Sequence, residues 1–244
     1  MSLNQNDEAL VTVQKWVSVD KEHPQAQHLL AILGGDPEYK RASNGYIEDY
    51  FDGFAEGFEN TLSQLKYETP KHIGELLEGL GLSPTTRARD LGCGTGLSGS
   101  VMQPYCEVLH GIDLSAGMLR IAKEKDIYQK LFKAELTDFL FTVIEPYNLI
   151  VSADTLCYFG DLEPVLKNAH RALTVPGDFV FSVEKGEADT PYKLLSSGRF
   201  AHSESYVRET LAQCGFQPPT VSSVKMRDDG TEPIFGYLFH TRRI

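Results

Sequence analysis

The chain has 244 residues, of which 41% are hydrophobic and 23% are charged. These values are ordinary for a globular protein, and the length suits one α/β domain with an N-terminal extension. The formal net charge of −11 argues against a nucleic-acid partner, because phosphate binding relies on a basic face. No apolar run approaches the ~20 residues of a membrane-spanning helix, so no membrane span is expected.

The cysteines indicate a reducing compartment. Cys93, Cys106, Cys157 and Cys214 are widely spaced and form no C-x-x-C pair, so neither a zinc site nor a redox pair is expected. The polar, acidic N-terminus argues against a secretory signal. We therefore expect a cytoplasmic protein without a bound metal. The sequence leaves the oligomeric state open.

Helical patterns come first along the chain. Residues 8–35 predict two helical pieces, with Pro24 in the first turn of the second and a stop at Gly34-Gly35. Residues 41–66 carry aromatic and leucine side chains at spacings of three and four, which predicts an amphipathic aromatic helix. Thr69-Pro70 begins another helix, which ends near Gly81.

From residue 86 onward, strand and helix patterns alternate, which is typical of an α/β protein with a parallel sheet. Strands are expected at 87–91, 107–112, 131–134, 147–152 and 178–184, and helices at 98–103, 115–125 and 162–173. A turn is expected at Pro176-Gly177. A helix at 203–214 precedes two strands, 220–226 and 234–241, which a hairpin loop at 228–230 joins.

A glycine-rich run links the first of these strands to the next helix. Residues 89–99 read RDLGCGTGLSG, and two overlapping patterns in them predict different cofactors. Residues 94–99 form G-x-G-x-x-G, which is typical of a dinucleotide site. Residues 90–96 form D-x-G-x-G-x-G, the glycine loop of an S-adenosylmethionine (SAM) site. Closely approaching backbone N–H groups suit either ligand, so the glycines alone do not decide between them.

Asp90 favours SAM. A carboxylate two residues before the first glycine would repel a pyrophosphate, whereas SAM carries an ammonium and a sulfonium that it would attract. The alternative is that Asp90 only holds the backbone of the loop. Asp113, at the end of the second strand, does not discriminate, because a carboxylate there can bind the ribose of either cofactor. The C-terminal hairpin also favours SAM over a nucleotide dehydrogenase.

Three ordered segments carry a resemblance to class I SAM-dependent methyltransferases over roughly residues 70–241. They are residues 88–96 (ARDLGCGTG), residues 111–122 (GIDLSAGMLRIA) and residues 147–154 (YNLIVSAD). More narrowly, the chain resembles predicted bacterial methyltransferases attached to tetratricopeptide repeats. That resemblance rests on residues 23–30, 50–55, 179–184 and 198–203. Most of a repeat array is missing from the chain, so we expect residues 1–66 to form a helical cap and residues 67–244 to form the SAM-binding catalytic domain.

The resemblance implies a Rossmann-like seven-stranded sheet in the order 3-2-1-4-5-7-6, with strand seven antiparallel and a helical N-terminal extension. It implies that SAM lies across the carboxyl ends of the first strands, with S-adenosylhomocysteine (SAH) as the product. The cofactor-binding residues that it implies, together with Asp90, are Gly92, Cys93, Gly94, Thr95, Gly96, Asp113, Leu114, Met118, Glu135, Leu136, Ser152 and Ala153. It also suggests that the aromatic helix covers the cofactor as a lid and brings Tyr46, Tyr50 or Phe51 to the site.

Four side chains are expected to face the substrate, on segments that follow strand ends or enter the next helix: Asp154, Tyr158, Glu184 and His202. Of these, Asp154, Tyr158 and His202 are the candidates for a catalytic role. His202 could accept a proton near neutral pH, although a lone histidine is more often structural. Arg199 could pair with an acidic group of the substrate or with nearby surface acids. The acceptor is expected to be a small molecule, with a protein acceptor also open. The alternatives are an NAD-dependent oxidoreductase and a non-catalytic SAM-binding or scaffold protein.

Overall fold

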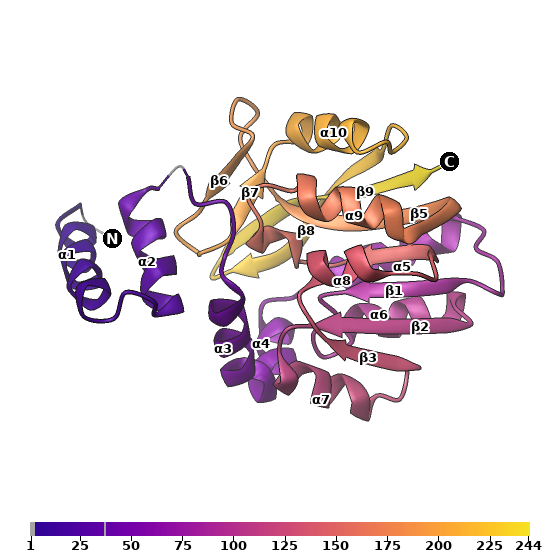
Figure 1. The fold of residues 1–244 in the computed structure, drawn as a ribbon, viewed down its shortest axis with the longest axis horizontal. Coiled ribbons are helices and arrows are strands. Elements are labelled where there is room, and N and C mark those ends of the chain that lie inside the picture. Colours follow the sequence, from indigo (N-terminus) through magenta and orange to yellow (C-terminus); the bar gives the residue numbers. More distant parts are fainter. Residues whose placement is uncertain (1–2, 37) are drawn as a thin grey trace.

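The computed structural model describes residues 3–36 and 38–244 (Figure 1). Its longer helices are α1 (Leu3–Val19), α2 (Pro24–Gly34), α3 (Asn44–Phe54), α4 (Phe58–Gln64), α5 (Thr69–Gly79), α6 (Leu97–Met102), α7 (Ala116–Glu124), α8 (Leu136–Thr142), α9 (Glu163–Ala172) and α10 (Glu204–Gln213). Short 3-10 helices are η1 (Ala55–Gly57), η2 (Gln103–Tyr105) and η3 (Leu156–Tyr158). The strands are β1 (Arg87–Leu91), β2 (Val108–Asp113), β3 (Lys130–Lys133), β4 (Tyr147–Ser152), β5 (Leu173–Lys185), β6 (Tyr192–Leu194), β7 (Phe200–His202), β8 (Thr220–Asp229) and β9 (Glu232–Arg243).

One sheet runs through the described residues, with its main strands in the order β3-β2-β1-β4-β5-β9-β8. The first five are parallel neighbours, and β9 is antiparallel to both β5 and β8. The predicted order 3-2-1-4-5-7-6 is confirmed, since β8 and β9 occupy the places of the sixth and seventh strands. The pattern did not predict the β6–β7 hairpin, which extends the sheet where Glu184 and Lys185 of β5 pair with Ala201 and His202.

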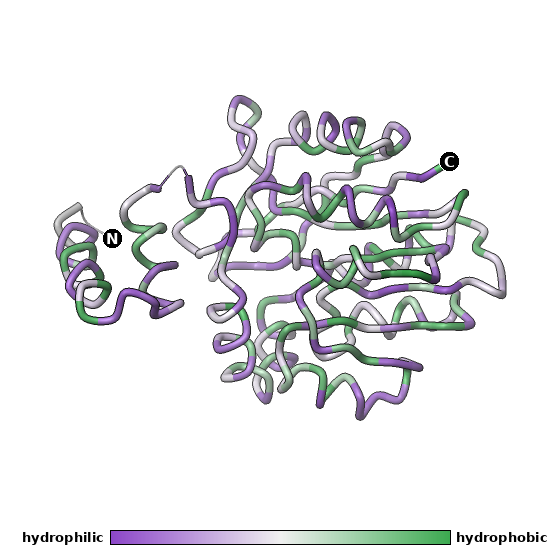
Figure 2. The backbone as a smooth tube through the Cα atoms, viewed as in Figure 1, coloured by the Kyte–Doolittle hydropathy of each residue, from purple (hydrophilic) through white to green (hydrophobic). Residues whose placement is uncertain are grey.

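Helices cover both faces of the sheet because the buried strands carry apolar side chains on alternate sides. On one face, Leu149, Val151 and Val180 pack with Ile73 of α5 and Met102 of α6. The other face packs against α8, α9 and α10, with Ile150, Phe179, Phe181, Val165 and Leu211 among its buried members. Figure 2 shows the hydrophobic stretches gathered in the central strands. Among the described residues, no helix is both long and apolar enough to cross a bilayer.

Three local predictions need correction. The aromatic segment at 41–66 is α3, η1 and α4 rather than one helix, and the break lies beside Gly53 and Gly57, which are poor helix formers. The expected turn at Pro176-Gly177 lies inside β5, where the pairing with β4 shifts register. Helix α8 was not predicted; the Glu135 side chain starts it by accepting the backbone N–H of Asp138.

The N-terminal helices form a pair that projects to one side of the sheet (Figure 1). His28 of α2 is fully buried, and its Nε2 lies 3.1 Å from the carbonyl oxygen of Gly198 in the β6–β7 turn. A carbonyl only accepts, so Nε2 carries the proton and Nδ1 accepts the Tyr39 hydroxyl at 2.9 Å. The ring also stacks on Tyr46 of α3, with centroids 3.9 Å apart. The described part of the predicted 1–66 extension is therefore joined to the sheet domain; residues 1, 2 and 37 lie outside the described residues.

The core packing gives a stability prediction. Phe181 is fully buried and stacks on Phe179 and Phe239. We expect Phe181→Ala to lower the free energy of unfolding by about 3–5 kcal/mol in urea titrations, through lost burial and a residual cavity. The matched control is Phe141→Ala, at a side chain that is 58% exposed, with an expected change within about 0.5 kcal/mol. Equal losses in the two variants would contradict this core.

Candidate active site

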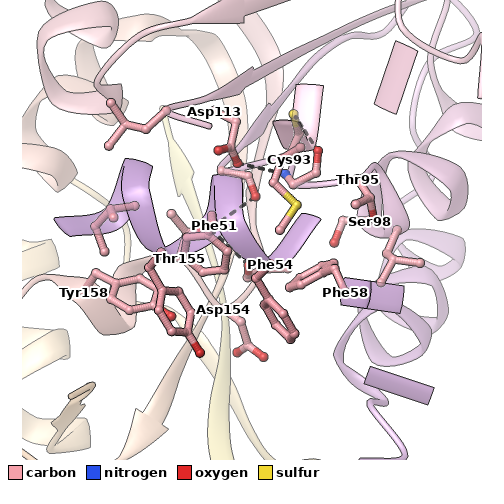
Figure 3. Close-up of a pocket in the computed structure, with 18 of the residues that line it drawn as sticks. Phe51, Phe54, Phe58, Cys93, Thr95, Ser98, Asp113, Asp154, Thr155 and Tyr158 are labelled. Carbon is pink, nitrogen blue, oxygen red and sulfur yellow. Dashed lines mark hydrogen bonds between the residues drawn. The ribbon is translucent and has the colours of Figure 1, made fainter. Parts of the chain in front are cut away.

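A cavity of ≈ 260 Å³ lies at the carboxyl ends of β1, β2 and β4 (Figure 3). β1 pairs with β2 on one side and with β4 on the other. The chain therefore builds the sheet outward from β1 in one direction through β2 and in the opposite direction through β4. Ligands of parallel α/β sheets bind at such a switch point. Helices α3 and α4 line the opposite wall, so the cavity is enclosed by segments far apart in the sequence.

The glycine loop forms the floor of this cavity. Gly92 and Gly94 line it and have φ angles of 67° and 52°, a region that favours glycine. A Cβ on Gly92 would overlap the side chain of Thr155, whereas one on Gly94 would meet only a Phe58 ring carbon at 3.8 Å. The loop backbone is therefore open to a ligand at Gly94.

Asp113 holds the loop in place from the end of β2. Its Oδ2 accepts the Gly94 N–H at 2.9 Å, and its Oδ1 accepts the Ser115 N–H at 2.9 Å. Burial raises the pKa of this carboxyl, and the backbone N–H groups oppose that rise. Asp113 also lines the cavity, where it can receive hydrogen bonds from a bound ligand (Figure 3).

Cys93 and Thr95 complete the loop and line the cavity, as the resemblance implies. Burial raises the pKa of the Cys93 thiol well above its usual range, so it stays protonated. The Thr95 hydroxyl is buried, yet its Oγ1 has no hydrogen-bond partner within the described part of the chain. A buried polar atom of this kind leaves a hydrogen bond for a ligand to make.

Contrary to the prediction from the sequence, the Asp90 carboxylate does not face the cavity. Asp90 is fully buried and does not line the cavity; its Oδ2 accepts the Tyr128 hydroxyl at 2.7 Å. Strand alternation explains this placement, because it turns the side chain away from the cavity. Burial raises its pKa to about 7. The alternative reading, in which Asp90 supports the structure around the loop, fits its contacts. Gly96 also lies outside the cavity lining and instead precedes α6 with a φ of 92°.

One end of the cavity has the predicted mixture of apolar and acidic side chains. Leu114 and Met118 follow β2, and Glu135 and Leu136 follow β3; all four line this end with Asp113. Glu135 is 8% exposed and pairs with Arg41 at 2.9 Å. Apolar walls around a few polar groups suit a planar heterocycle such as adenine.

Aromatic side chains of α3 and α4 cover the cavity, as Figure 3 shows for Phe51, Phe54 and Phe58. Phe51 packs edge-on against Tyr158, with centroids 5.7 Å apart. Tyr50 also lines the cavity. Tyr46 does not, because its ring stacks on His28. The predicted lid segment therefore lies over the site, with Phe51 but not Tyr46 reaching it.

An acidic row on this lid contacts the sheet domain; its members are Glu48, Asp52, Glu56 and Glu59. Asp52 Oδ1 accepts the Ser115 hydroxyl at 2.5 Å and the Gly117 N–H at 2.9 Å, and these bonds lower its pKa. The glutamates pair with Lys133, Arg120 and Lys125. Exposed ion pairs are individually weak, so each pair of this row adds little free energy to the contact between the lid and the sheet domain.

The other end of the cavity follows β4. Asp154 lines it with a φ of 51°, and its Oδ1 accepts the Ser182 hydroxyl at 3.1 Å. Burial raises the pKa of Asp154, and Arg199 and Arg227 oppose that rise. Tyr158 also lines this end, and burial raises the pKa of its hydroxyl. The positive φ of Asp154 is uncommon for a non-glycine residue, and such backbone conformations are often found at functional positions.

Two further predicted residues lie elsewhere. His202 is fully buried outside the cavity lining, with Nε2 3.2 Å from the Gly160 carbonyl, and burial lowers its pKa to about 4. It does not reach the site as the predicted base would. Ser152 is also outside the lining and bonds the carbonyl oxygen of Leu91 at 3.2 Å, whereas its neighbour Ala153 lines the cavity.

Sequence reasoning missed several lining residues. Thr155 joins the β1 and β4 ends, with its Oγ1 3.2 Å from the Leu91 carbonyl. Arg227 reaches the cavity from β8, and Tyr67 from the loop before α5. Neither position belongs to a recognisable motif. β8 also carries Lys225, Asp228 and Asp229, so the charge of Arg227 gave no signal that this residue enters the cavity.

Comparisons with known proteins agree with this arrangement. A family model described as "Methyltransferase domain" matches residues 90–179. The chain is 34% identical over 96 residues to the biotin biosynthesis bifunctional protein BioHC of Saccharophagus degradans, covering 38% of this chain and 17% of that protein. It is 28% identical over 130 residues to the probable S-adenosylmethionine-dependent methyltransferase CRG1 of Saccharomyces cerevisiae, covering 50% of this chain and 44% of that protein. The chain thus spans less than half the length of these curated relatives.

Solved structures show the same fold. The magnesium protoporphyrin IX methyltransferase of Synechocystis PCC 6803, with bound SAH, superposes with a TM-score of 0.63 at 15% identity, covering 82% of this chain and 99% of that one. The protein therefore has the Rossmann-like class I methyltransferase fold with a helical N-terminus. Residues 90–179 match the methyltransferase-domain model, and the Synechocystis enzyme with the same fold holds SAH.

The environment of Asp90 gives a pH prediction. The pKa of the Asp90 carboxyl rises to about 7 on folding, because ionising the buried group is unfavourable. The free energy of unfolding therefore falls as the pH rises from the pKa of Asp90 in the unfolded chain toward 7. Asp90→Asn keeps an acceptor for Tyr128 and removes this cost. Between pH 5 and pH 8 we expect the variant to gain roughly 2 kcal/mol in unfolding free energy relative to wild type, measured in urea. The exposed-site control Asp49→Asn should show no such gain, and a pH-independent difference for Asp90→Asn would refute a buried neutral carboxyl.

Proposed function

We propose that the protein is a SAM-dependent methyltransferase that acts on a small molecule. The observation that carries this proposal is the joining of the Asp113-held glycine loop, an apolar pocket and an aromatic lid in one cavity. A lid over the cavity favours a small acceptor, because it shields the reacting atoms from water and leaves less room for a macromolecular chain. The net charge of −11 argues against a nucleic-acid acceptor.

The residues present fit SAM. We assign Asp113 to the ribose hydroxyls, Leu114, Met118 and Leu136 to the adenine walls, and the Gly94 backbone with the unpartnered Thr95 hydroxyl to the methionine end. When bound, SAM supplies a methyl group on a positively charged sulfur, which keeps the bond electrons as the methyl leaves. The protein's own part is to align the acceptor and exclude water.

Asp154 and Tyr158 are the residues we propose for the acceptor side. Both line the cavity, and the raised pKa of Asp154 suits it to take a proton from an acceptor O–H or N–H group. Tyr158 forms an edge-on wall with Phe51. His202 has no place in this proposal because it lies outside the cavity.

The division of the chain is also a proposal. We assign residues 1–66 to a cap whose α3–α4 part is the lid, and residues 67–244 to the catalytic domain. The paired helices α1 and α2 support a repeat-like unit, so kinship with methyltransferases attached to tetratricopeptide repeats stays a prediction. All four cysteines are free thiols, which supports the proposed cytoplasmic location.

Calorimetric titration tests the cofactor assignment. We expect SAH to bind the wild-type protein and NADH not to bind. Asp113→Ala should weaken SAH binding by about tenfold or more, because it removes a charged acceptor and releases the loop. Asp189→Ala, at an exposed loop position, is the control and should leave the affinity unchanged. NADH binding without SAH binding would favour the oxidoreductase alternative and refute the proposal.

Limited proteolysis tests the lid. Trypsin can cleave at Lys40, Arg41 and Lys66, which bracket α3 and α4. Saturating SAM should slow cleavage at these sites severalfold, because contacts with the ligand add to the weak acidic row. Cleavage at Lys21, between α1 and α2, is the internal control and should not change. Equal rates with and without SAM would show that the segment is not a lid.

A further inference from the structure

Two arginines lie together at the acceptor end of the cavity. Arg199 comes from the turn before β7, and Arg227 comes from β8; both line the cavity. They meet at Glu184 of β5, whose Oε1 lies 3.0 Å from Arg199 Nε and 2.6 Å from Arg227 Nη2. Glu184 is 4% exposed and does not line the cavity, so this carboxylate lies behind the two guanidinium groups.

Arg199 is held firmly by this cluster. Its Nη2 donates to the Cys157 sulfur at 3.0 Å and to the Asp154 carbonyl at 3.4 Å. Burial lowers its pKa, but Cys157, Tyr158, Asp154 and Glu184 raise it more, so the pKa is well above its usual value. A cation fixed in this way keeps its charge in any ligand complex.

Arg227 has a donor without a partner. The residue is 8% exposed, and its Nη1 is buried with no hydrogen-bond partner in the part of the chain that the structure describes. A buried, charged N–H group without an acceptor is costly, so its presence beside a cavity indicates that a ligand supplies the acceptor. Glu184 pairs with Arg227 Nη2 and Arg199 Nε, so Arg227 Nη1 is the donor that can bind a further anion.

The second acid at this end is already engaged. Asp154 also lies at this end, where its Oδ1 accepts the Ser182 hydroxyl. The cavity lining also includes apolar side chains from α4 and from the residue that follows it, namely Phe58, Leu62 and Leu65. The acceptor end therefore offers a cationic anchor at the far side of an apolar chamber.

We propose that the methyl acceptor is an organic acid with an apolar body, whose carboxylate is bound by Arg227 and Arg199. This inference rests on the proposed function. The planar fork of a guanidinium matches a carboxylate in two parallel hydrogen bonds. The apolar body lies against the lid phenylalanines and leucines, so the acid is oriented before the lid closes. Arg227 is in this account a specificity-determining residue.

Matched pairs of ligands test the anchor without any variant. Hexanoate, octanoate and 4-phenylbutyrate are each titrated calorimetrically beside their primary amides, with and without SAH. The acids should bind at least about tenfold more tightly than the amides of the same shape, because only the acids carry the charge. Equal binding within the pairs, or no binding by any acid, would overturn the proposal.

Variants then locate the effect. Arg227→Met preserves volume and leaves Glu184 paired with Arg199; it should reduce the acid preference to within about twofold and leave SAH affinity unchanged. Arg208→Met, on the solvent side of α10, should retain the preference. Loss of SAH binding in a folded Arg227→Met protein would instead assign the arginine to the carboxylate of the cofactor. If wild type fails to bind SAH, the proposed function fails, while the titrations without SAH still decide on the anchor.

Discussion

The contact between Gly92 and Thr155 is the constraint on which the cavity depends. Thr155 follows β4, and its Oγ1 lies within 3.3 Å of the carbonyl oxygens of Leu91 and Gly92 at the end of β1. A Cβ at Gly92 would occupy the space of the threonine side chain, so only glycine lets the two strand ends approach. This approach places the glycine loop and Asp154 on adjoining walls of one cavity.

A second set of contacts joins the N-terminal lid to that cavity, and it is built from weaker interactions. The acidic row meets α7 and β3 mainly through exposed ion pairs, while Asp52 makes the stronger bonds to Ser115 and Gly117. Ser115 lies two residues after Asp113, whose carboxylate accepts the Ser115 backbone N–H. The α3–α4 segment and the glycine loop are therefore held by the same turn, through Asp113 and Ser115.

Local patterns predicted the strands, the glycine loop and the acid at the end of the second strand. The sheet order and most of the cavity-lining residues came from the resemblance to class I methyltransferases, because no local pattern specifies which strands pair. Sequence reasoning failed where the outcome depends on side-chain direction or on distant packing. Asp90 and His202 have the right chemistry, but strand alternation and burial turn them away from the cavity. Arg227 reaches the site only because β8 pairs with β9 beside β5, a contact that no local pattern specifies.

The most direct measurement is a crystal structure of the protein with SAH. We expect the SAH ribose at Asp113 and the adenine between Leu114 and Leu136. The sulfur should face Asp154 beneath the α3–α4 lid, with Arg227 free to meet the acceptor. SAH bound outside this cavity, or inside it with its sulfur turned toward Glu135, would contradict the proposed site.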